Sequence, residues 1–252
     1  MGNILEVKDV AKYFGGVKAL DGVSLTVPER GVIGLIGPNG SGKTTLFNVV
    51  TGFYVPTRGE VWFRDERIDG LNPNEVYLKG VVRTFQIPRL FSSLTVLENV
   101  LLTPPRQEGE SVLKAPFTKK WSDQEVSLAK KAVTLLRKFG MGDLINSKVA
   151  ELSAAHMKMI ETIRGLMGDA KLYLLDEPAA GVAYDTAVDL FRFIRKLRDE
   201  EGLTFFIIEH RLEVLMDFVD YVYVLHNGKL LAEGKPDEVV QDPKVIEAYL
   251  GG

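Results

Sequence analysis

The sequence predicts an α/β fold: a mostly parallel sheet between helices, with an antiparallel β part at the N-terminal end and a helical part inserted in the middle. Short apolar segments at 32–37, 172–175 and 203–208 alternate with helical patterns. This alternation is typical of a parallel sheet buried on both faces. Only helical patterns occur in the middle of the chain, so we expect an α/β core of about 1–90 and 168–252 and a helical subdomain of about 91–167, within one domain.

Composition excludes several classes of protein. The 252 residues are 46% hydrophobic and 26% charged, which excludes a disordered or collagen-like chain. A net charge of −3 creates no general attraction to nucleic acid. With no cysteine and three histidines, disulfides, iron–sulfur ligation and cysteine zinc sites are excluded, and a His-rich metal cluster is not expected. No signal peptide or membrane-spanning run is evident, so we expect a soluble chain whose membrane association depends on a partner.

The N-terminal third reads mainly as strands. Residues 20–27 alternate as a half-buried strand does, 28–31 form a turn, and 32–36 form a wholly apolar strand. A glycine-rich loop leads to a helix over about 43–50 that Gly52 ends. Residues 59–63 are predicted as an edge strand, with hairpins rather than helices around it.

The rest of the chain alternates helices with strands. Residues 103–120 are predicted as an exposed loop, Ser122–Glu125 as a capping box that opens a helix ended by Gly140, and Ser153 as the start of the next helix. Strands at 172–175 and 203–208 flank a helix that includes 190–197. Asn227–Gly228 between two strand patterns predicts a hairpin, and a helix from near Pro236 closes the chain.

One motif carries a specific chemistry. A glycine-rich segment fits G-x-x-x-x-G-K-[ST] between an apolar strand and a helix, as Gly37, Pro38, Asn39, Gly40, Ser41, Gly42, Lys43 and Thr44. Backbone N–H groups of such a loop surround phosphate oxygens, and the helix N-terminus adds a favourable dipole. We expect Lys43 to reach the terminal phosphates and Thr44 to bind Mg²⁺, so the sequence predicts a nucleoside triphosphate site.

A second motif supplies carboxylates. Residues 171–175 form an apolar strand that ends in Asp176 and Glu177. The carboxyl end of such a strand is the edge at which open α/β sheets bind ligands. We expect Asp176 to hold Mg²⁺ and Glu177 to act as general base on an attacking water.

The order of these motifs resembles the ATPase subunits of ABC transporters over nearly the whole chain. The resemblance rests on the phosphate loop, Gln86 in RTFQ, the helical block, the helix start at Glu151–Ser153, LLDEP and the pair Glu209–His210. Further segments resemble the branched-chain amino-acid importer branch: KYFGG at 12–16, residues 82–85, TVLEN at 95–99, PAAG at 178–181 and IIEH at 207–210. Lipopolysaccharide exporters share much of this core. The resemblance implies a P-loop, RecA-like core.

It also implies roles for individual residues. Phe14, with Tyr13 as the alternative, would stack on adenine; Gln86 would contact Mg²⁺ and the attacking water; and His210 would bond the γ-phosphate and Glu177. Residues 90–120 would dock a permease. The implied ATP-binding set is Phe14, Gly37, Pro38, Asn39, Gly40, Ser41, Gly42, Lys43, Thr44 and Thr45; the catalytic set is Glu177, His210 and Gln86; the metal set is Thr44, Gln86 and Asp176.

Family members complete each ATP site across a head-to-tail dimer, through a signature that is usually Leu-Ser-Gly-Gly-Gln. Here the matching residues after Leu152 are Ser153, Ala154, Ala155 and His156. Alanine at the second glycine position crowds the γ-phosphate while its N–H remains. Many relatives also carry Asp or Asn where Ala183 stands. We therefore expect normal ATP binding, weaker dimer closure and slower hydrolysis.

The expected function is ATP hydrolysis that powers uptake of branched-chain or other hydrophobic amino acids. The expected partners are ATP with Mg²⁺, a second copy or a paralogous ATPase subunit, and membrane permease subunits on the cytoplasmic face of the cell membrane, with no nucleic acid. The alternatives are a nucleotide-binding structural or regulatory subunit that does not hydrolyse, and the ATPase of a lipid or lipopolysaccharide exporter. The altered signature motivates the first alternative, and retention of Glu177 and His210 argues against it.

Overall fold

The computed structural model describes residues 2–84, 89–110, 117, 121–168 and 170–250. It divides into two units, one formed by 1–86 and 170–252 and the other by 87–169. The boundaries expected at 90 and 168 lie close to these. No helix among the described residues is both long and apolar enough to cross a membrane.

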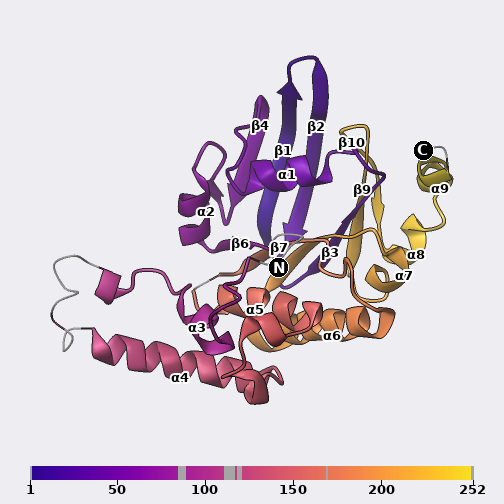
Figure 1. Cartoon of the computed structure of the whole chain (residues 1–252). Coiled ribbons are helices and arrows are strands. Elements are labelled where there is room, and N and C mark those ends of the chain that lie inside the picture. The colour runs from indigo at the N-terminus through magenta and orange to yellow at the C-terminus, as the bar shows by residue number, and fades with distance from the viewer. Residues whose placement is uncertain (1, 85–88, 111–116, 118–120, 169, 251–252) are drawn as a thin grey trace. The chain divides into compact units, whose positions relative to one another are not determined.

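The larger unit holds two sheets (Figure 1). The antiparallel sheet has the order β2-β1-β4-β5, with β1 Asn3–Phe14, β2 Val17–Pro28, β4 Arg58–Phe63 and β5 Glu66–Arg67. The second has the order β10-β9-β3-β8-β7-β6, with β3 Val32–Ile36, β6 Val81–Arg83, β7 Leu172–Asp176, β8 Thr204–Ile208, β9 Tyr221–His226 and β10 Lys229–Gly234. All its pairings are parallel except β9 with β10. The predicted α/β class with an N-terminal antiparallel part is confirmed.

Burial explains why the central strands could be predicted. Every residue of β3, β7 and β8 is buried, as their uninterrupted apolar runs imply. The core also includes the apolar side chains of helix α1 Lys43–Val50 and of both sheets, among them Leu46, Phe47, Val61 and Phe206. Helix α1 therefore fixes the phosphate loop that precedes it against the core of the larger unit.

The other helices of this unit are α2 Pro73–Lys79, α6 Tyr184–Glu201, α7 Leu212–Leu215, α8 Pro236–Val239 and α9 Pro243–Leu250. Three expectations here were wrong. A helix, α2, follows β5, and Asn72 and Glu75 cap it reciprocally. Strand β4 is not an edge strand, because β1 and β5 pair with its two sides. The C-terminal helix begins at Pro236 as expected, but it does not continue to the end of the chain: α8 ends at Val239, and a second helix, α9, begins at Pro243.

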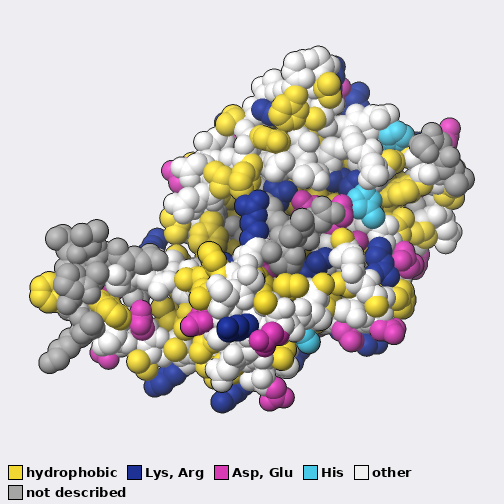
Figure 2. All heavy atoms as spheres, in the orientation of Figure 1, with side chains coloured by type: hydrophobic (Ala, Val, Ile, Leu, Met, Phe, Trp, Pro, Cys, Tyr) yellow, Lys and Arg dark blue, Asp and Glu magenta, His cyan; other side chains and the backbone are white. Residues whose placement is uncertain are grey.

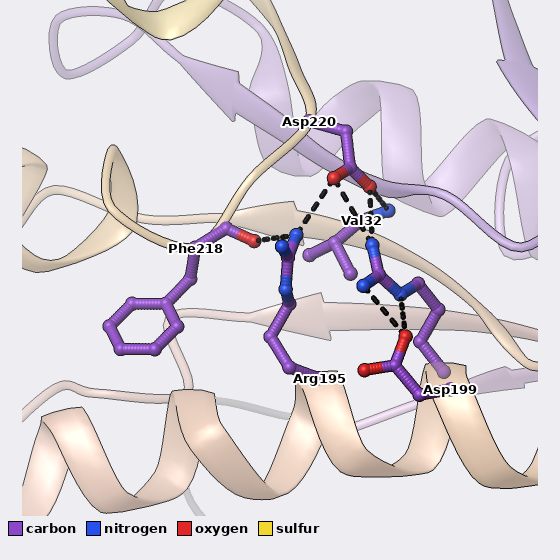
Figure 3. Close-up of polar contacts among 6 residues, drawn as sticks. Val32, Arg195, Asp199, Phe218 and Asp220 are labelled. Carbon is purple, nitrogen blue, oxygen red and sulfur yellow. Dashed lines mark hydrogen bonds and ion pairs between the residues drawn. The ribbon is translucent and has the colours of Figure 1, made fainter.

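A charged cluster joins α6 to the start of β3 (Figure 3). The carboxylate of Asp220 accepts hydrogen bonds from the Val32 N–H at 2.8 Å and from Arg195 Nη1 at 2.7 Å. Arg198 Nη1 donates to the same carboxylate at 3.1 Å, and Arg195 also donates to the Phe218 carbonyl. These bonds fix the strand that leads into the phosphate loop relative to the helix behind it.

The smaller unit is helical among its described residues. Its helices are α3 Val96–Leu101, α4 Ser122–Lys138 and α5 Ala154–Leu166, with short 3-10 turns η1 Glu108–Glu110, η3 Gly142–Leu144 and η4 Val149–Glu151. The expected capping box at Ser122 is wrong: Trp121 occupies the N-cap, and its carbonyl accepts the Glu125 N–H. Most of the predicted loop after residue 110 lies outside the described residues.

Candidate functional site

The phosphate loop has a backbone that requires glycine at two positions. Gly37 has φ of +148°, and a Cβ there would lie 2.1 Å from the Leu225 carbonyl oxygen. Gly42 has φ of +106°, and its Cβ would lie 2.5 Å from the carbonyl oxygen of Ala19. The loop is thus packed between β2 and the β9–β10 hairpin, whose Gly228 N–H donates to the Ser41 carbonyl at 3.0 Å. This packing holds the loop in one conformation.

Lys43 is held inside the loop. Its ammonium donates to the carbonyl oxygens of Gly37 at 2.8 Å and Pro38 at 2.9 Å. Burial lowers the pKa of Lys43, while the nearby carboxylates of Glu177 and Asp176 act in the opposite direction. A cation at the base of an amide-lined loop is suited to bind the phosphates of a nucleotide.

A cavity of about 450 Å³ lies over this loop. Its lining includes most of the expected ATP-binding residues and two of the three expected catalytic residues, Glu177 and His210. The full lining is Val17, Lys18, Ala19, Asn39, Gly40, Ser41, Gly42, Lys43, Thr44, Thr45, Glu177, His210 and Asn227. The structure therefore brings together residues that lie more than a hundred positions apart in the sequence.

Glu177 and His210 form a pair in this cavity. His210 Nε2 lies 3.1 Å from Glu177 Oε1, with both side chains partly exposed. Glu177 has φ of 52°, a left-handed conformation that is strained for a residue with a side chain. Its N–H donates to the Ile208 carbonyl at 2.9 Å, at the end of the neighbouring strand β8. A carboxylate and an imidazole in contact beside a phosphate loop can orient and deprotonate a water.

Asp176, the last residue of β7, has a buried partner that sequence reasoning missed. Arg83 Nη2 donates to Asp176 Oδ2 at 2.8 Å, and the two side chains are 7% and 11% exposed. Arg83 also bonds Asn48 Oδ1 and lies over the rings of Phe47 and Phe53. An arginine directly after the apolar pair Val81–Val82 is a pattern that could have indicated this contact.

The aromatic candidates differ in environment. Phe14 is 42% exposed and packs edge-on against Tyr54, with ring centroids 5.2 Å apart, while Lys12 lies over its face. Tyr13 donates its hydroxyl to Asp21 Oδ1 at 2.8 Å instead. Figure 2 shows hydrophobic side chains on the surface near the tip of the β1–β2 hairpin, where Phe14 and Val17 are exposed. Of the two rings, Phe14 is the exposed one, with Lys12 over one face, and it does not line the cavity.

The remaining predicted residues lie elsewhere. Gln86 lies outside the described residues. In the smaller unit, Ser153 caps α5 by accepting the His156 N–H at 3.3 Å. Ala154, which follows it, is exposed, and Ala155 is buried. Ala183 is the N-cap of α6, and no side-chain bond caps that helix.

Comparison with known proteins places the chain in a family. Residues 20–180 match the family described as "ABC transporter", and residues 229–252 match "Branched-chain amino acid ATP-binding cassette transporter". The chain is 44% identical over 252 residues to the probable branched-chain amino acid transport ATP-binding protein LivG of Methanocaldococcus jannaschii, covering 98% of this chain and 97% of that protein. It is 39% identical to the Pseudomonas aeruginosa protein BraF, covering 98% of each.

Solved structures agree with these relatives. A nucleotide-free ATP-binding cassette of an ABC transporter superposes with a TM-score of 0.86 at 43% identity, covering 100% of both chains. An ATP-binding cassette solved in its ADP conformation superposes with a TM-score of 0.87 at 43% identity, again covering 100% of both chains. Since the family match spans the phosphate loop, Asp176 and Glu177, and the structural match spans both units, the chain belongs to the ABC transporter family as an ATP-binding, ATP-hydrolysing subunit.

Proposed function

We propose that this chain hydrolyses ATP to power a transporter that takes up branched-chain amino acids, and that it is held on the cytoplasmic face of the membrane by permease subunits. The observation that carries hydrolysis is the contact of His210 with Glu177 in the cavity over the phosphate loop. The names of the relatives, together with the match of residues 229–252, support the class of substrate.

In this proposal the phosphate loop binds the nucleotide, and the residues at the carboxyl ends of β7 and β8 act on the attacking water. N–H groups of residues 39–44 and the ammonium of Lys43 bind the β- and γ-phosphates. Glu177 accepts a proton from the attacking water, and His210 keeps that carboxylate oriented and bonds the γ-phosphate. Most of the catalysis then comes from positioning and from stabilising charge on the transferred phosphoryl group.

Mg²⁺ would enter with ATP. The hydroxyl of Thr44 and the carboxylate of Asp176 are oxygen ligands, the type that Mg²⁺ prefers, so the described donor set fits this ion. When bound, the ion neutralises charge on the β- and γ-phosphates. Arg83 holds the Asp176 carboxylate in a fixed orientation at the end of β7. The expected third donor, Gln86, lies outside the described residues.

A second copy of the chain would complete the site. A cassette that is 26% identical to this chain, with a TM-score of 0.73, was solved as a dimer in a post-hydrolysis state with ADP and Pi. In this chain Ser153 keeps a hydroxyl at the start of α5, but two alanines follow it. Ala155, at the second glycine position expected to crowd the γ-phosphate, is buried, whereas Ala154 at the first position is exposed. The added methyl of Ala154 therefore supports the expectation of weaker closure on the partner's γ-phosphate.

The non-hydrolysing alternative is disfavoured. A subunit that only binds nucleotide has no need of a carboxylate and an imidazole held in contact beside the phosphate loop. The left-handed conformation of Glu177 adds a cost in stability of about 1–3 kcal/mol that such a subunit would gain nothing from.

Uptake in cells tests the proposal. Cells of the source organism that lack this chain should lose uptake of radiolabelled leucine and regain it with the wild-type chain but not with Glu177→Gln. Uptake of an unrelated sugar serves as the control. Unchanged leucine uptake in the deletion strain would contradict the substrate, and rescue by Glu177→Gln would contradict the role of hydrolysis.

A further inference from the structure

Glu209 is a buried charged residue that the proposed chemistry does not use. It directly follows β8, one position before His210, and only 1% of its surface is exposed. Burying a carboxylate is costly unless its oxygens accept hydrogen bonds. The hydrogen-bond donors that compensate this cost identify the segments that Glu209 connects.

The carboxylate of Glu209 accepts backbone N–H groups from two separate turns. Oε1 accepts from Ala179 at 2.5 Å, in the turn that follows Glu177. Oε2 accepts from His210 at 2.9 Å and from Arg211 at 3.3 Å, in the turn that follows β8. One buried side chain thus links the turn that carries the general base to the turn that carries its histidine partner.

Arg211 makes a second link between the same two turns. Its Nη1 donates to the Val182 carbonyl at 2.8 Å, and its guanidinium lies over the ring of Tyr184. Its Nε contacts Glu213 Oε1 at 3.3 Å within its own turn. Glu209 and Arg211, the two neighbours of His210 in the sequence, therefore hold the two ends of residues 179–182: Glu209 bonds Ala179, and Arg211 bonds Val182.

This double link acts on a strained part of the chain. Glu177 keeps its left-handed backbone only while its surroundings hold it there. The N–H of Ala180 returns to the Glu177 carbonyl at 3.1 Å, so a displacement of residues 179–182 shifts Glu177 directly. An error of about 1 Å in such a position can cost about 100-fold in rate.

We propose that Glu209 and Arg211 are positioning residues that hold Glu177 and His210 in their reactive arrangement by tying residues 179–182 to residues 209–211. This inference rests on the proposed hydrolysis of ATP. Neither side chain lines the cavity over the phosphate loop, so they act on the rate of the chemical step and not on nucleotide binding.

The test compares turnover with binding in the purified full-length chain. Glu209→Gln replaces one acceptor oxygen by an NH₂ group, so one of the two turns faces a donor instead of an acceptor. We expect kcat for ATP hydrolysis to fall at least about tenfold, while KM and the affinity for a fluorescent ATP analogue stay within about twofold. Arg211→Met should likewise lower kcat without changing KM or the affinity for the analogue. Arg211→Lys, which keeps a donor for Val182, should retain most of the wild-type kcat.

A matched variant controls for loss of charge. Asp189→Asn removes an exposed carboxylate from α6 and should leave kcat unchanged. An unchanged kcat in both Glu209→Gln and Arg211→Met would overturn the inference. So would a parallel loss of nucleotide affinity, which indicates general unfolding. An inactive wild-type chain would instead count against the proposed hydrolysis itself, so the two failures are distinguishable.

Discussion

The cavity over the phosphate loop differs from two other segments in how much of its expected chemistry is kept. These segments are the signature at 152–156 and residues 181–185, where the family resemblance implies a group at Ala183 that helps the two sites communicate across the dimer. In the cavity, Lys43, Glu177 and His210 are all present, and buried contacts hold their surroundings. In the segments at 152–156 and 181–185, the helix starts remain. The family resemblance, however, leads us to expect Gly where Ala154 and Ala155 stand, and Asp or Asn where Ala183 stands. The difference supports the proposal that the chain binds and cleaves ATP and that closure on a second copy limits its rate.

The largest effect is expected from removing the general base in the cavity over the phosphate loop. Glu177→Gln removes the general base while it preserves the shape of the side chain, so hydrolysis should fall by about 10²–10⁴-fold with ATP binding retained. Steady-state ATPase assays and nucleotide titration measure the two quantities. Glu233→Gln, at an exposed position of β10, is the matched control and should have no effect. Retained turnover in Glu177→Gln would remove the base from the mechanism.

Restoring the segment at 152–156 should act in the opposite direction. Replacing Ala154 and Ala155 by Gly and His156 by Gln should raise the ATPase rate by about 10–100-fold, on the scale of a recovered phosphate donor. The gain should grow with protein concentration, because it comes from dimer closure. Ala150→Gly, an exposed alanine in the same unit, is the control. A rate that stays at the wild-type value would show that closure does not limit turnover.

The ion pair of Arg83 with Asp176 gives a test of metal binding on the cavity side of the comparison, because stability can be measured with and without Mg²⁺. Arg83→Met leaves a buried carboxylate without its guanidinium, so the free energy of unfolding should fall by about 3–5 kcal/mol without nucleotide. Mg·ATP should recover more of the lost Tm than ATP with a chelator does, because Asp176 is then free to face the metal. Equal recovery with and without Mg²⁺ would separate Asp176 from metal binding.

The smallest effect concerns the two helix starts. Ala183→Asp supplies the side-chain cap that α6 lacks and should stabilise the chain by about 0.5–2 kcal/mol. Ser153→Ala removes the existing cap of α5 and should destabilise it by a similar amount. Urea unfolding measures both. Shifts of the same sign would show that Ala183 does not act as an N-cap.

Short sequence patterns predicted the elements whose structure depends on neighbouring residues in the sequence. The apolar strands, the phosphate loop, the cap at Ser153 and the hairpin at Asn227–Gly228 all follow from short sequence patterns. Helix α2 was missed although its capping box is visible in the sequence, because hairpins were expected around β4. The expected cap at Ser122 failed because Trp121 takes that position.

Contacts between distant segments could not be predicted in the same way. Arg83 meets Asp176 because β6 pairs with β7 in register, with Arg83 opposite Leu174. Glu209 meets Ala179 because β8 ends beside β7. Sequence patterns indicate that a charge follows a strand, but only the sheet order shows which partner lies across from it.

Nucleotide binding by the phosphate loop is the central claim, and titration of the purified chain with ATP and Mg²⁺ tests it most directly. Lys43→Ala removes charge-assisted bonds of about 1.5–3 kcal/mol, so its affinity should fall by roughly 10–100-fold from the wild-type value. A wild-type chain that does not bind ATP, or a Lys43→Ala variant that binds as well as wild type, would contradict the account.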